Sequence, residues 1–402
     1  MGGCDIRRPR IGLDLHVVDG IYQGSRTHCL ELFSRVVAAI PECDFIILAA
    51  DPRRLLDFSE CFRSANVTFV AMAPAAAPIR LLWQLPHLAR EHRMDLIHTQ
   101  YITPPFSPCA TAVTVHDILF ESHPEYFERL FVLRSRLLVR RAARRSLGVF
   151  TVSDFSRRQI AETFRIVPEK IHVIPNGVDR ARFFPGSEGS EVAENLGLEP
   201  GRYFLTVGRL EPRKNHANLL RAWARLGRPR PRLTIVGQPH FRYSESLDLI
   251  HTLDLDRDVV VLEAISDRQL PAIYRNARAF VYCSWAEGFG MPVLEAMASG
   301  IPVISSATTA LTEICADAAL LVGPGDVDEI SNAVLQLDQK LDLRQNLILR
   351  GLRRVRQYDW QNAVDVVRNA YLGYFGLTMN ESLFQVNKCL EKGVGSVLAD
   401  HR

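Results

Sequence analysis

The chain has 402 residues, of which 47% are hydrophobic and 23% are charged, a globular composition that excludes disorder along its whole length. The 48 Lys and Arg residues against 45 Asp and Glu residues give a net charge of +3, which argues against an obligate nucleic-acid partner. The eight cysteines are scattered without a C-x-x-C pair, so they fit a reducing cytosol and predict no zinc site. No apolar run approaches the roughly 20 residues that span a membrane. We therefore expect a cytoplasmic protein.

The first half of the chain alternates short aliphatic runs with helical patterns. The runs lack a regular apolar–polar alternation, which indicates strands buried on both faces and hence a parallel sheet covered by helices. Helices are predicted over residues 27–40 and 79–91. Strands are predicted over residues 11–18, 45–50, 67–72, 96–100, 112–116 and 149–152, and the run 171–178 closes this half.

A polar stretch rich in Gly, Pro and Glu, residues 184–200, is typical of a connection between domains. The alternation then restarts and continues to about residue 339. The sequence thus predicts an α/β chain with two open sheets, one in a domain over residues 1–183 and one in a domain over residues 201–377. Ligands of such sheets bind at the carboxyl ends of the strands, here near the cleft between the domains. Residues 378–402 form a tail without a recognisable pattern.

The segment 286–300, A-E-G-F-G-M-P-V-L-E-A-M-A-S-G, follows one of these strands. Pro292 suits the first turn of a helix, because its missing N–H costs nothing there. Gly288 and Gly290 are therefore expected in the loop before the helix, and Glu295 in its first turn. Glycines at such a loop let the backbone approach a ligand closely.

The start of this helix is predicted to bind an anion through the free amides of Val293 and Leu294. Glu287 and Glu295 cannot bind that anion, but carboxylates accept hydrogen bonds from hydroxyls. A ligand that is both phosphorylated and polyhydroxylated fits this arrangement. The alternative is a surface glutamate and an ordinary charge near a helix N-terminus.

A second motif, V-G-R-L-E-P-R-K-N over residues 207–215, ends the first strand of the second half. Gly208 removes a side chain where the strand ends, and Asn215 is a good N-cap for the next helix. Arg209 and Lys214 bracket the turn, and two cations at a helix start can hold a phosphate without a metal. The alternative is a solvated basic turn.

A third motif, T-V-H-D over residues 114–117, ends a strand of the first half. His116 is expected to face the cleft, where it can bond a hydroxyl or polarise a leaving group, although a structural histidine is the alternative. Gly24, between the first strand and its helix, is the matching glycine-loop candidate.

Other charged patterns favour simpler interpretations. The D-x-D pairs at 254–256 and 326–328 are expected to be turn and cap residues rather than metal ligands. The arginines of residues 134–145 do not gather on one helix face and have leucines between them. This pattern favours a partly solvated helix over one that faces a membrane surface or a phosphate.

Taken in order, these segments resemble the family 4 retaining glycosyltransferases. E-G-F-G-M-P-V-L-E-A-M-A-S-G-I-P-V-I-S-S is similar to the E-x7-E segment of that family, and V-G-R-L-E-P-R-K-N, H-D-I-L-F-E-S-H-P-E-Y-F, V-S-D-F-S-R-R and P-E-K-I-H-V-I-P-N-G-V-D are similar to others. The resemblance covers residues 10–375 and is closest to bacterial members that transfer mannose or related hexoses in surface-polysaccharide assembly. It implies the GT-B fold, two Rossmann-like domains facing each other across a cleft.

The resemblance also implies roles for single residues. Arg209 and Lys214 would hold the donor diphosphate and stabilise its charge as it leaves. Glu287 would hold the hexose hydroxyls, Glu295 would accept from the ribose hydroxyls, and His116 would sit beside the sugar on the acceptor side. The segment 265–270 would border the base. The implied donor-binding residues are Gly24, Gly208, Arg209, Lys214, Ile265, Leu270, Glu287, Phe289, Gly290, Met291 and Glu295.

The implied activity is retaining transfer of a hexose, with mannose from GDP-mannose favoured, from a nucleotide sugar to a glycan or lipid-linked glycan. Residues 1–183 would bind the acceptor and residues 201–377 the donor, with no metal or other cofactor, in the cytoplasm or at the inner face of the membrane. Alternatives are an epimerase or phosphorylase of the same fold, and a silent nucleotide-sugar-binding subunit. A silent subunit usually lacks one of the charged site residues, but this chain has all four: Arg209, Lys214, Glu287 and Glu295.

Overall fold

The computed structural model describes residues 7–19, 24–240 and 243–377, so the predicted tail lies outside the described residues. The chain divides into two compact units. The first contains the chain up to Val113, residues 145–149 and the chain from Val364 onward, and the second contains residues 114–144 and 150–363.

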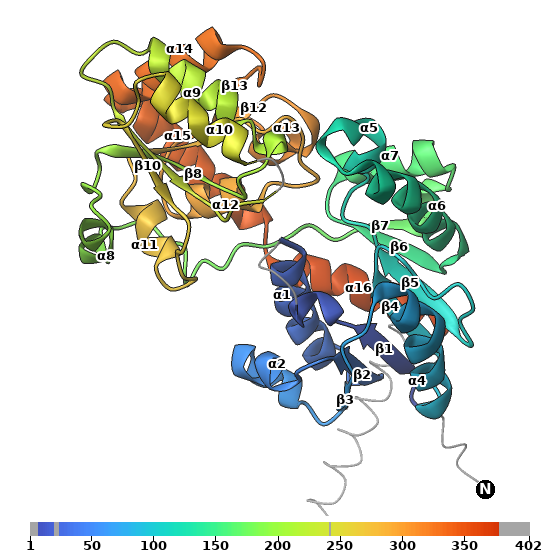
Figure 1. Cartoon of the computed structure of the whole chain (residues 1–402). Helices are drawn as coiled ribbons and strands as arrows, with labels where there is room; N and C mark the ends of the chain where they lie inside the picture. Colours follow the sequence, from blue (N-terminus) through green and yellow to red (C-terminus); the bar gives the residue numbers. More distant parts are fainter. Residues whose placement is uncertain (1–6, 20–23, 241–242, 378–402) are drawn as a thin grey trace, which may run out of the picture. The chain divides into compact units, whose positions relative to one another are not determined.

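A seven-stranded sheet is built by the first half of the chain, in the order β3-β2-β1-β4-β5-β6-β7 (Figure 1). Strand β1 pairs in parallel with both β2 and β4, which sets Ile11 opposite Phe45 and Leu96. The strands are β1 Arg10–Asp14, β2 Asp44–Ala49, β3 Val67–Ala71, β4 Leu96–Gln100, β5 Ala110–Thr114, β6 Gly148–Thr151 and β7 Ile171–Val173.

A six-stranded parallel sheet follows, in the order β10-β9-β8-β11-β12-β13. In both sheets the strand order reverses after the first strand, as in Rossmann-like folds, so the predicted fold class is confirmed. The strands are β8 Tyr203–Val207, β9 Arg232–Val236, β10 Val259–Leu262, β11 Ala279–Tyr282, β12 Val303–Ser306 and β13 Ala319–Val322.

Side chains from both faces of the second sheet are buried. Successive residues of β8 point to opposite faces, so Tyr203 packs in one core cluster and Phe204 in the other. Helix α12 (Met291–Ala298) covers the first cluster with its apolar residues, and α9 (His216–Arg225) covers the second, where Trp223 meets Phe204 edge to face with ring centroids 5.4 Å apart.

Two predicted elements of the first half differ from the structure. The strand predicted over residues 11–18 ends at Asp14, whose carboxylate accepts a hydrogen bond from the His16 amide at 3.3 Å and so starts a turn. The helix predicted over residues 79–91 is interrupted by a π-helical turn, η3 (Arg80–Gln84). Pro86 follows that turn and has no N–H for the carbonyl one turn earlier, which explains the change in the hydrogen-bond ladder.

The last described helix, α16 (Trp360–Tyr374), returns to the first unit. The Tyr371 hydroxyl lies 2.5 Å from His98 Nδ1 of β4, and Arg368 pairs with Glu42 at 3.1 Å. The end of the chain thus secures the first sheet, although the second sheet precedes it in sequence.

Within the described ranges, no helix combines the length and the apolar character that crossing a membrane requires. The remaining helices are α1 Gly24–Ala39, α2 Arg53–Phe58, α3 Ala77–Ile79, α4 Leu85–Glu91, α5 Leu119–Ser122, α6 Arg129–Arg145, α7 Asp154–Phe164, α8 Ser190–Asn195, α10 Ser244–Thr252, α11 Leu270–Arg275, α13 Thr309–Cys315, α14 Val327–Gln339 and α15 Leu341–Arg354. The 3₁₀ turns are η1 His16–Asp19, η2 Glu60–Arg63, η4 Pro124–Tyr126, η5 Pro168–Lys170, η6 Pro212–Lys214 and η7 Val355–Gln357.

Candidate active site

The order of the second sheet reverses between β8 and β11, which pair side by side. In open parallel sheets, the loops at the carboxyl ends of such a pair form the ligand site. The loop after β8 carries Arg209 and Lys214, and the loop after β11 carries Glu287. The topology therefore brings together two motifs that lie far apart in the sequence.

Glu287 is the centre of a buried ion cluster. Its Oε1 accepts hydrogen bonds from Lys214 Nζ at 2.7 Å and from the Tyr282 hydroxyl at 3.0 Å, while its Oε2 pairs with the Arg213 guanidinium at 2.8 Å. Lys214 also donates to the Tyr282 hydroxyl at 2.6 Å, and Arg213 donates to Glu211 at 2.6 Å. These five residues are called the Glu287 cluster below.

The charges of the Glu287 cluster hold its carboxylate ionised. Burial alone would raise the pKa of Glu287, but the positive charges of Arg213 and Lys214 outweigh it and lower the pKa to about 2. Burial lowers the pKa of Lys214, and Glu287 partly offsets this effect. Burial also opposes the charge of Arg213, but Glu287 and Glu211 together raise its pKa. The ionised Glu287 carboxylate can therefore accept hydrogen bonds from hydroxyls, and the Arg213 and Lys214 side chains can donate to phosphate oxygens.

Arg209 contacts a different partner. Its guanidinium nitrogen lies 3.2 Å from His240 Nε2, and His240 in turn pairs with Glu211 at 3.3 Å. Arg213, rather than Arg209, shares Glu287 with Lys214. The proposed contact of Arg209 with a diphosphate stays a prediction.

Two residues of the loop after β8 position Lys214. A Cβ atom at Gly208 would lie 3.4 Å from Lys214 Cε, so the lysine side chain passes close to bare backbone. Asn215 occupies the N-cap position of α9 with a φ of 60°, but makes no capping bond with its side chain. Its amide instead donates to the carbonyls of Cys283 at 2.9 Å and Pro324 at 2.6 Å. These bonds tie the loop after β8 to the end of β11.

Close approaches shape the glycine loop at residues 287–290. A Cβ atom at Gly288 would lie 2.5 Å from a carboxylate oxygen of Asp117. Gly290 has a φ of +119°, and a Cβ atom there would lie 2.6 Å from Leu311 Cδ2. The Phe289 side chain is buried in the core. Both glycines are thus required by local packing, whatever ligand the loop binds.

The start of α12 differs from the prediction in two respects. The helix begins at Met291 with Pro292 as its second residue, so Glu295 lies in the second turn rather than the first. The Val293 amide donates to the Gly290 carbonyl at 3.0 Å, so it is not free for an anion as predicted. The left-handed conformation of Gly290 turns that carbonyl toward the first turn of the helix.

Glu295 has a very different environment from Glu287. Its carboxylate accepts a hydrogen bond from the Tyr274 hydroxyl at 2.9 Å. Burial raises the pKa of Glu295 to about 7, against the lowering effects of Tyr274 and Arg182. Ile265 and Leu270, which were expected to border the nucleotide base, are partly buried and pack against the core cluster that α12 covers.

The T-V-H-D motif reaches the glycine loop through Asp117. His116 is buried and its carbonyl accepts from the Thr151 hydroxyl at 3.2 Å, while the Asp117 carboxylate lies against Gly288. The Ser153 hydroxyl donates to the Gly288 carbonyl at 2.8 Å. The Glu313 carboxylate also accepts from two backbone amides at the start of α7, at 3.0 and 2.9 Å. Asp117 and Ser153 therefore both contact the glycine loop at Gly288, while Glu313 joins α13 to the start of α7.

Sequence reasoning missed Arg213, Tyr282, Tyr274 and Asp117. Arg213 stands inside the basic motif beside Lys214, and its partner only becomes evident once β8 and β11 are adjacent. The tyrosines belong to apolar patterns, where an aromatic residue is normally a core residue. Gly24 is the first residue of α1 in the other unit, so its predicted role is not tested by the geometry of this site.

Both D-x-D pairs have the simple roles that were predicted. Asp254 pairs with Arg228 at 2.7 Å in the turn after α10, and Asp326 caps α14 by accepting from the Glu329 amide at 2.9 Å. Within the described part of the chain, no three His, Cys, Asp or Glu side chains gather closely enough to hold a metal ion.

Comparisons with known proteins identify the family of this chain. Residues 22–182 match the model of Glycosyltransferase Family 4, and residues 191–354 match that of Glycosyl transferases group 1. The chain is 32% identical over 302 residues to the O-antigen chain mannosyltransferase B of Escherichia coli, which covers 73% of this chain and 77% of that protein.

Solved structures show the same fold. The sucrose-phosphate synthase from Thermosynechococcus elongatus matches with a TM-score of 0.74 at 20% identity, over 92% of this chain and 100% of that one. Anabaena Alr3699/HepE in complex with UDP-glucose matches with a TM-score of 0.71 at 18% identity, over 90% of this chain and 98% of that one. The chain therefore belongs to the family 4 glycosyltransferases and is a glycosyltransferase with the GT-B fold.

Proposed function

We propose that this glycosyltransferase moves a hexose from a nucleotide sugar to a glycan or lipid-linked glycan with retention of the anomeric configuration. The observation that carries the proposal is Glu287, held ionised by Arg213 and Lys214 beside the glycine loop at the reversal point of the sheet. An ionised carboxylate accepts hydrogen bonds from sugar hydroxyls, and the adjacent cations stabilise a departing diphosphate.

In the proposed reaction the bond between the anomeric carbon and the diphosphate breaks, and the acceptor oxygen bonds to the same face of that carbon. The acceptor proton passes to the departing phosphate. Lys214 and Arg209 bind the diphosphate, so the charge that develops on it meets fixed cations. Glu287 holds the hexose with the backbone of residues 289–291, and His116 borders the acceptor side.

Glu295 is proposed to bind the ribose. Among the described residues, the Tyr274 hydroxyl is the side-chain donor bonded to this carboxylate, so the hydroxyls of a ribose would complete its hydrogen bonding. Ile265 and Leu270 are proposed to border the base, and Gly24 to let the first loop approach the diphosphate. Residues 201–377 would bind the donor, residues 1–183 the acceptor, and residues 184–200 would connect them.

The proposed donor is GDP-mannose. The relative from Escherichia coli is named as a mannosyltransferase of the O-antigen chain, which supports both the sugar and a polysaccharide acceptor. Since lipid-linked glycans are assembled at membranes, we also propose a cytoplasmic protein that associates peripherally with the inner face of the membrane.

A thermal-unfolding screen tests the donor. GDP- and UDP-linked hexoses are added one at a time, because a ligand that binds only the folded state raises its stability by RT ln(1 + [L]/Kd). The largest shift is expected for GDP-mannose. The anomeric configuration of the product, followed by NMR with that donor, then tests retention; an inverted product would contradict the proposed reaction.

A further inference from the structure

Helix α6 exposes apolar side chains on its outer face. Leu130, Leu133 and Leu137, called the leucine stripe below, keep 77%, 68% and 71% of their surface exposed. The buried residues of the helix include Val132 and Val139. At about 100° per residue, the leucine stripe lies on the side opposite these valines. The most apolar side chains of the outer face therefore point away from the core.

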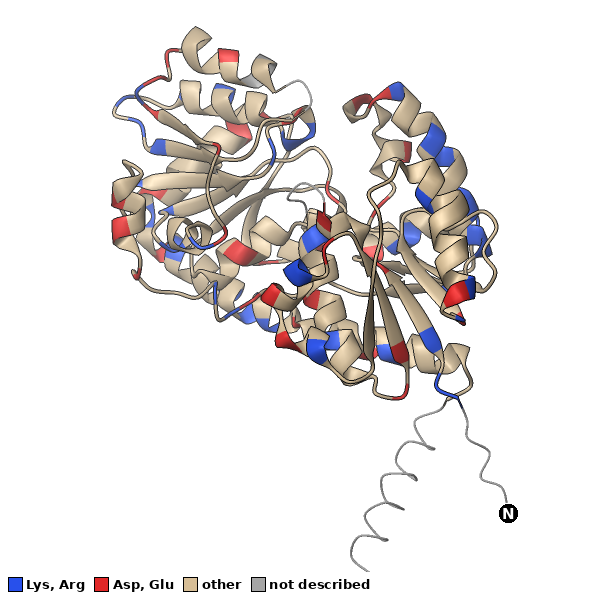
Figure 2. Cartoon of the chain, turned by 60° about the horizontal axis from the view of Figure 1, so that its bottom comes forward, with Lys and Arg blue, Asp and Glu red and all other residues tan. Residues whose placement is uncertain are grey.

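Arginines flank the leucine stripe on both sides. The helix contains seven arginines and no acidic residue. In projection along the axis, Arg129 and Arg140 lie to one side of the stripe, and Arg134 and Arg141 to the other. In Figure 2, the blue of Lys and Arg recurs along the long helix at the right. The arginines do not gather on one face, as predicted, but the expected solvated helix leaves the exposed leucines between them without an explanation.

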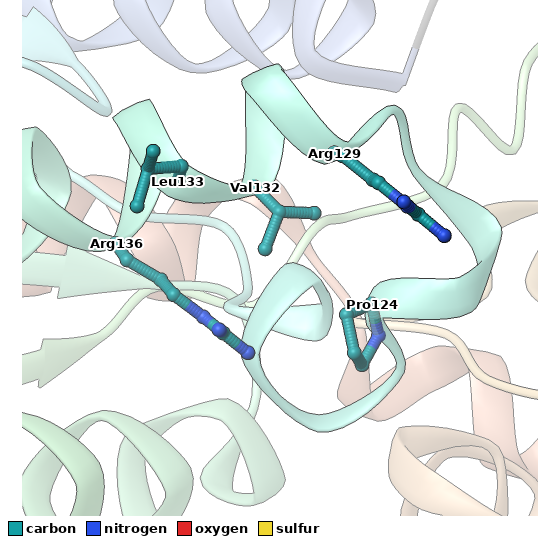
Figure 3. Close-up of a pocket in the computed structure, with 5 residues that line it drawn as sticks. All are labelled: Pro124, Arg129, Val132, Leu133 and Arg136. Carbon is teal, nitrogen blue, oxygen red and sulfur yellow. The ribbon is translucent and has the colours of Figure 1, made fainter.

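A pocket of about 270 Å³ lies beside the N-terminal part of the stripe. Arg129 and Arg136 extend on its two sides, with Val132 and Leu133 between them (Figure 3). Arg136 also pairs with Glu121 at 2.9 Å. The pocket combines an apolar base with a cationic rim, which suits a phosphate-bearing headgroup.

The glutamates near α6 lie in the segment before the helix and not in the helix itself. Glu121, Glu125 and Glu128 precede α6, and the chain from Arg129 to Arg145 has none. The positive charge thus coincides with the exposed leucines rather than with the preceding turn. The exposed leucines and the arginines both find partners in a structure with an anionic surface above an apolar layer. An anionic lipid bilayer has this structure.

We propose that the leucine stripe and its flanking arginines dock this enzyme on an anionic membrane surface, with the leucines entering the acyl boundary and the arginines facing lipid phosphates. This inference specifies the surface for the peripheral membrane association that is part of the proposed function, and it rests on that part. It does not depend on the identity of the donor or on retention.

Co-sedimentation of the full chain with vesicles tests the proposal. The wild-type protein should bind vesicles of equal parts phosphatidylcholine and phosphatidylglycerol at least tenfold more tightly than vesicles of phosphatidylcholine alone. Raising the salt from about 0.1 M to about 1 M shortens the Debye length from about 10 Å to about 3 Å, so it should weaken binding. Equal binding to both vesicle types would contradict the proposed charge recognition.

Replacing the leucine stripe with serine should lower binding at least tenfold, and Arg134→Gln with Arg140→Gln should weaken it and reduce its salt dependence. The matched control is Leu341→Ser with Leu349→Ser on α15, where both leucines are also exposed, at 56% and 65%. The control should bind like the wild type. If the stripe variant also binds like the wild type, α6 is not the docking surface.

A second measurement does not depend on disruptive variants. In Leu137→Trp, the added tryptophan should be quenched by brominated lipid in the anionic vesicles, whereas in Leu349→Trp it should not. Absence of additional quenching in Leu137→Trp would overturn the proposal. So would a dimer in solution that the stripe variant dissociates, since the leucines would then form a contact between two copies. Transfer to a water-soluble acceptor, measured on the same proteins, should be unchanged, so loss of docking and loss of the enzymatic function remain distinguishable.

Discussion

Glu287 and Glu295 lie eight positions apart around the start of α12, yet their environments have opposite effects on the carboxylate. Glu287 is surrounded by two cations and a tyrosine, and its pKa falls to about 2. Glu295 has one tyrosine hydroxyl as its bonded partner, and burial raises its pKa to about 7. The neighbouring charges thus keep the buried Glu287 ionised, whereas the half-buried Glu295, with no cation bonded to it among the described residues, titrates near neutral pH.

The comparison shows which groups a ligand must supply. In the Glu287 cluster, two carboxylates balance two cations. A diphosphate that binds Lys214 must therefore compete with the ion pair between Lys214 and Glu287. Among the described residues, Tyr274 alone donates a side-chain hydrogen bond to Glu295, so a polyhydroxylated ligand would add further hydrogen bonds to this carboxylate. This difference leads us to expect large effects on turnover at the first position and effects on donor affinity at the second.

The largest effect is expected for Lys214→Ala, which removes the cation nearest to Glu287. We expect turnover to fall on the order of 10²-fold or more, because a fixed charge that stabilises the leaving group acts mainly in the transition state. Arg209→Ala should also lower kcat. Steady-state kinetics measure both effects, and exposed Lys340→Ala is the matched control. Unchanged turnover in both single variants would contradict the assignment of a cationic diphosphate site.

Glu287→Gln should lower transfer at least tenfold while it keeps the shape of the side chain. It also leaves Arg213 and Lys214 without their shared anion, and breaking a buried ion pair costs about 3–5 kcal/mol of folding stability. Activity is therefore measured at a temperature where the variant is folded by circular dichroism, with the exposed Glu60→Gln as control. A silent Glu287→Gln beside a severe Glu295→Gln would reverse the hexose and ribose assignments.

The pH dependence of stability distinguishes the two carboxylates further. The pKa of Glu287 in the folded state is below its ordinary value, so its contribution to stability is present above about pH 4.5 and is lost as the pH falls toward 2. The pKa of Glu295 is raised, so ionisation of this group destabilises the fold as the pH rises from about 4.5 through 7. Above pH 7, Glu295→Gln should therefore be more stable than the wild type, by on the order of 2 kcal/mol. Denaturant unfolding across this pH range measures the difference.

The ionisation of Glu295 should also have a smaller effect on the affinity for the donor. Ribose hydroxyls bond best to the ionised carboxylate, so donor binding should weaken below pH 7, by at most about tenfold per pH unit. Glu295→Gln should raise the KM for the donor and remove this pH dependence with little change in kcat. A wild-type affinity that does not vary between pH 6 and pH 8 would contradict the ribose role.

Much of the fold could be predicted from the sequence because buried parallel strands leave aliphatic runs between helical patterns. Glu287 and Lys214 were selected as candidate site residues because they follow predicted strands, and the strand ends of such folds position ligand-binding side chains. Arg213 could not be assigned, since its role depends on the pairing of two distant strands. The placement of Glu295 in the first turn of α12 was wrong, because the left-handed conformation of Gly290, after which the helix starts at Met291, is not evident from its neighbours. The exposure of the α6 leucines could not be predicted, since the same sequence also fits a helix that buries these leucines.

The smallest effect is expected from chelation. At the Glu287 end of α12, Arg213 and Lys214 already pair with the two oxygens of the Glu287 carboxylate, so a divalent cation would have to displace one of these ion pairs before it could bind there. The D-x-D aspartates are engaged in a turn and a helix cap. We therefore predict that sugar transfer persists in excess EDTA, with at most mild stimulation by divalent ions acting on released nucleotide. The assay uses purified protein treated with EDTA and then supplied again with Mn²⁺. Loss of activity on chelation with full rescue by the metal would show that the diphosphate charge is neutralised by an ion. The cations of the Glu287 cluster would then not be sufficient to neutralise the diphosphate, and the proposed difference between Glu287 and Glu295 would be wrong for Glu287.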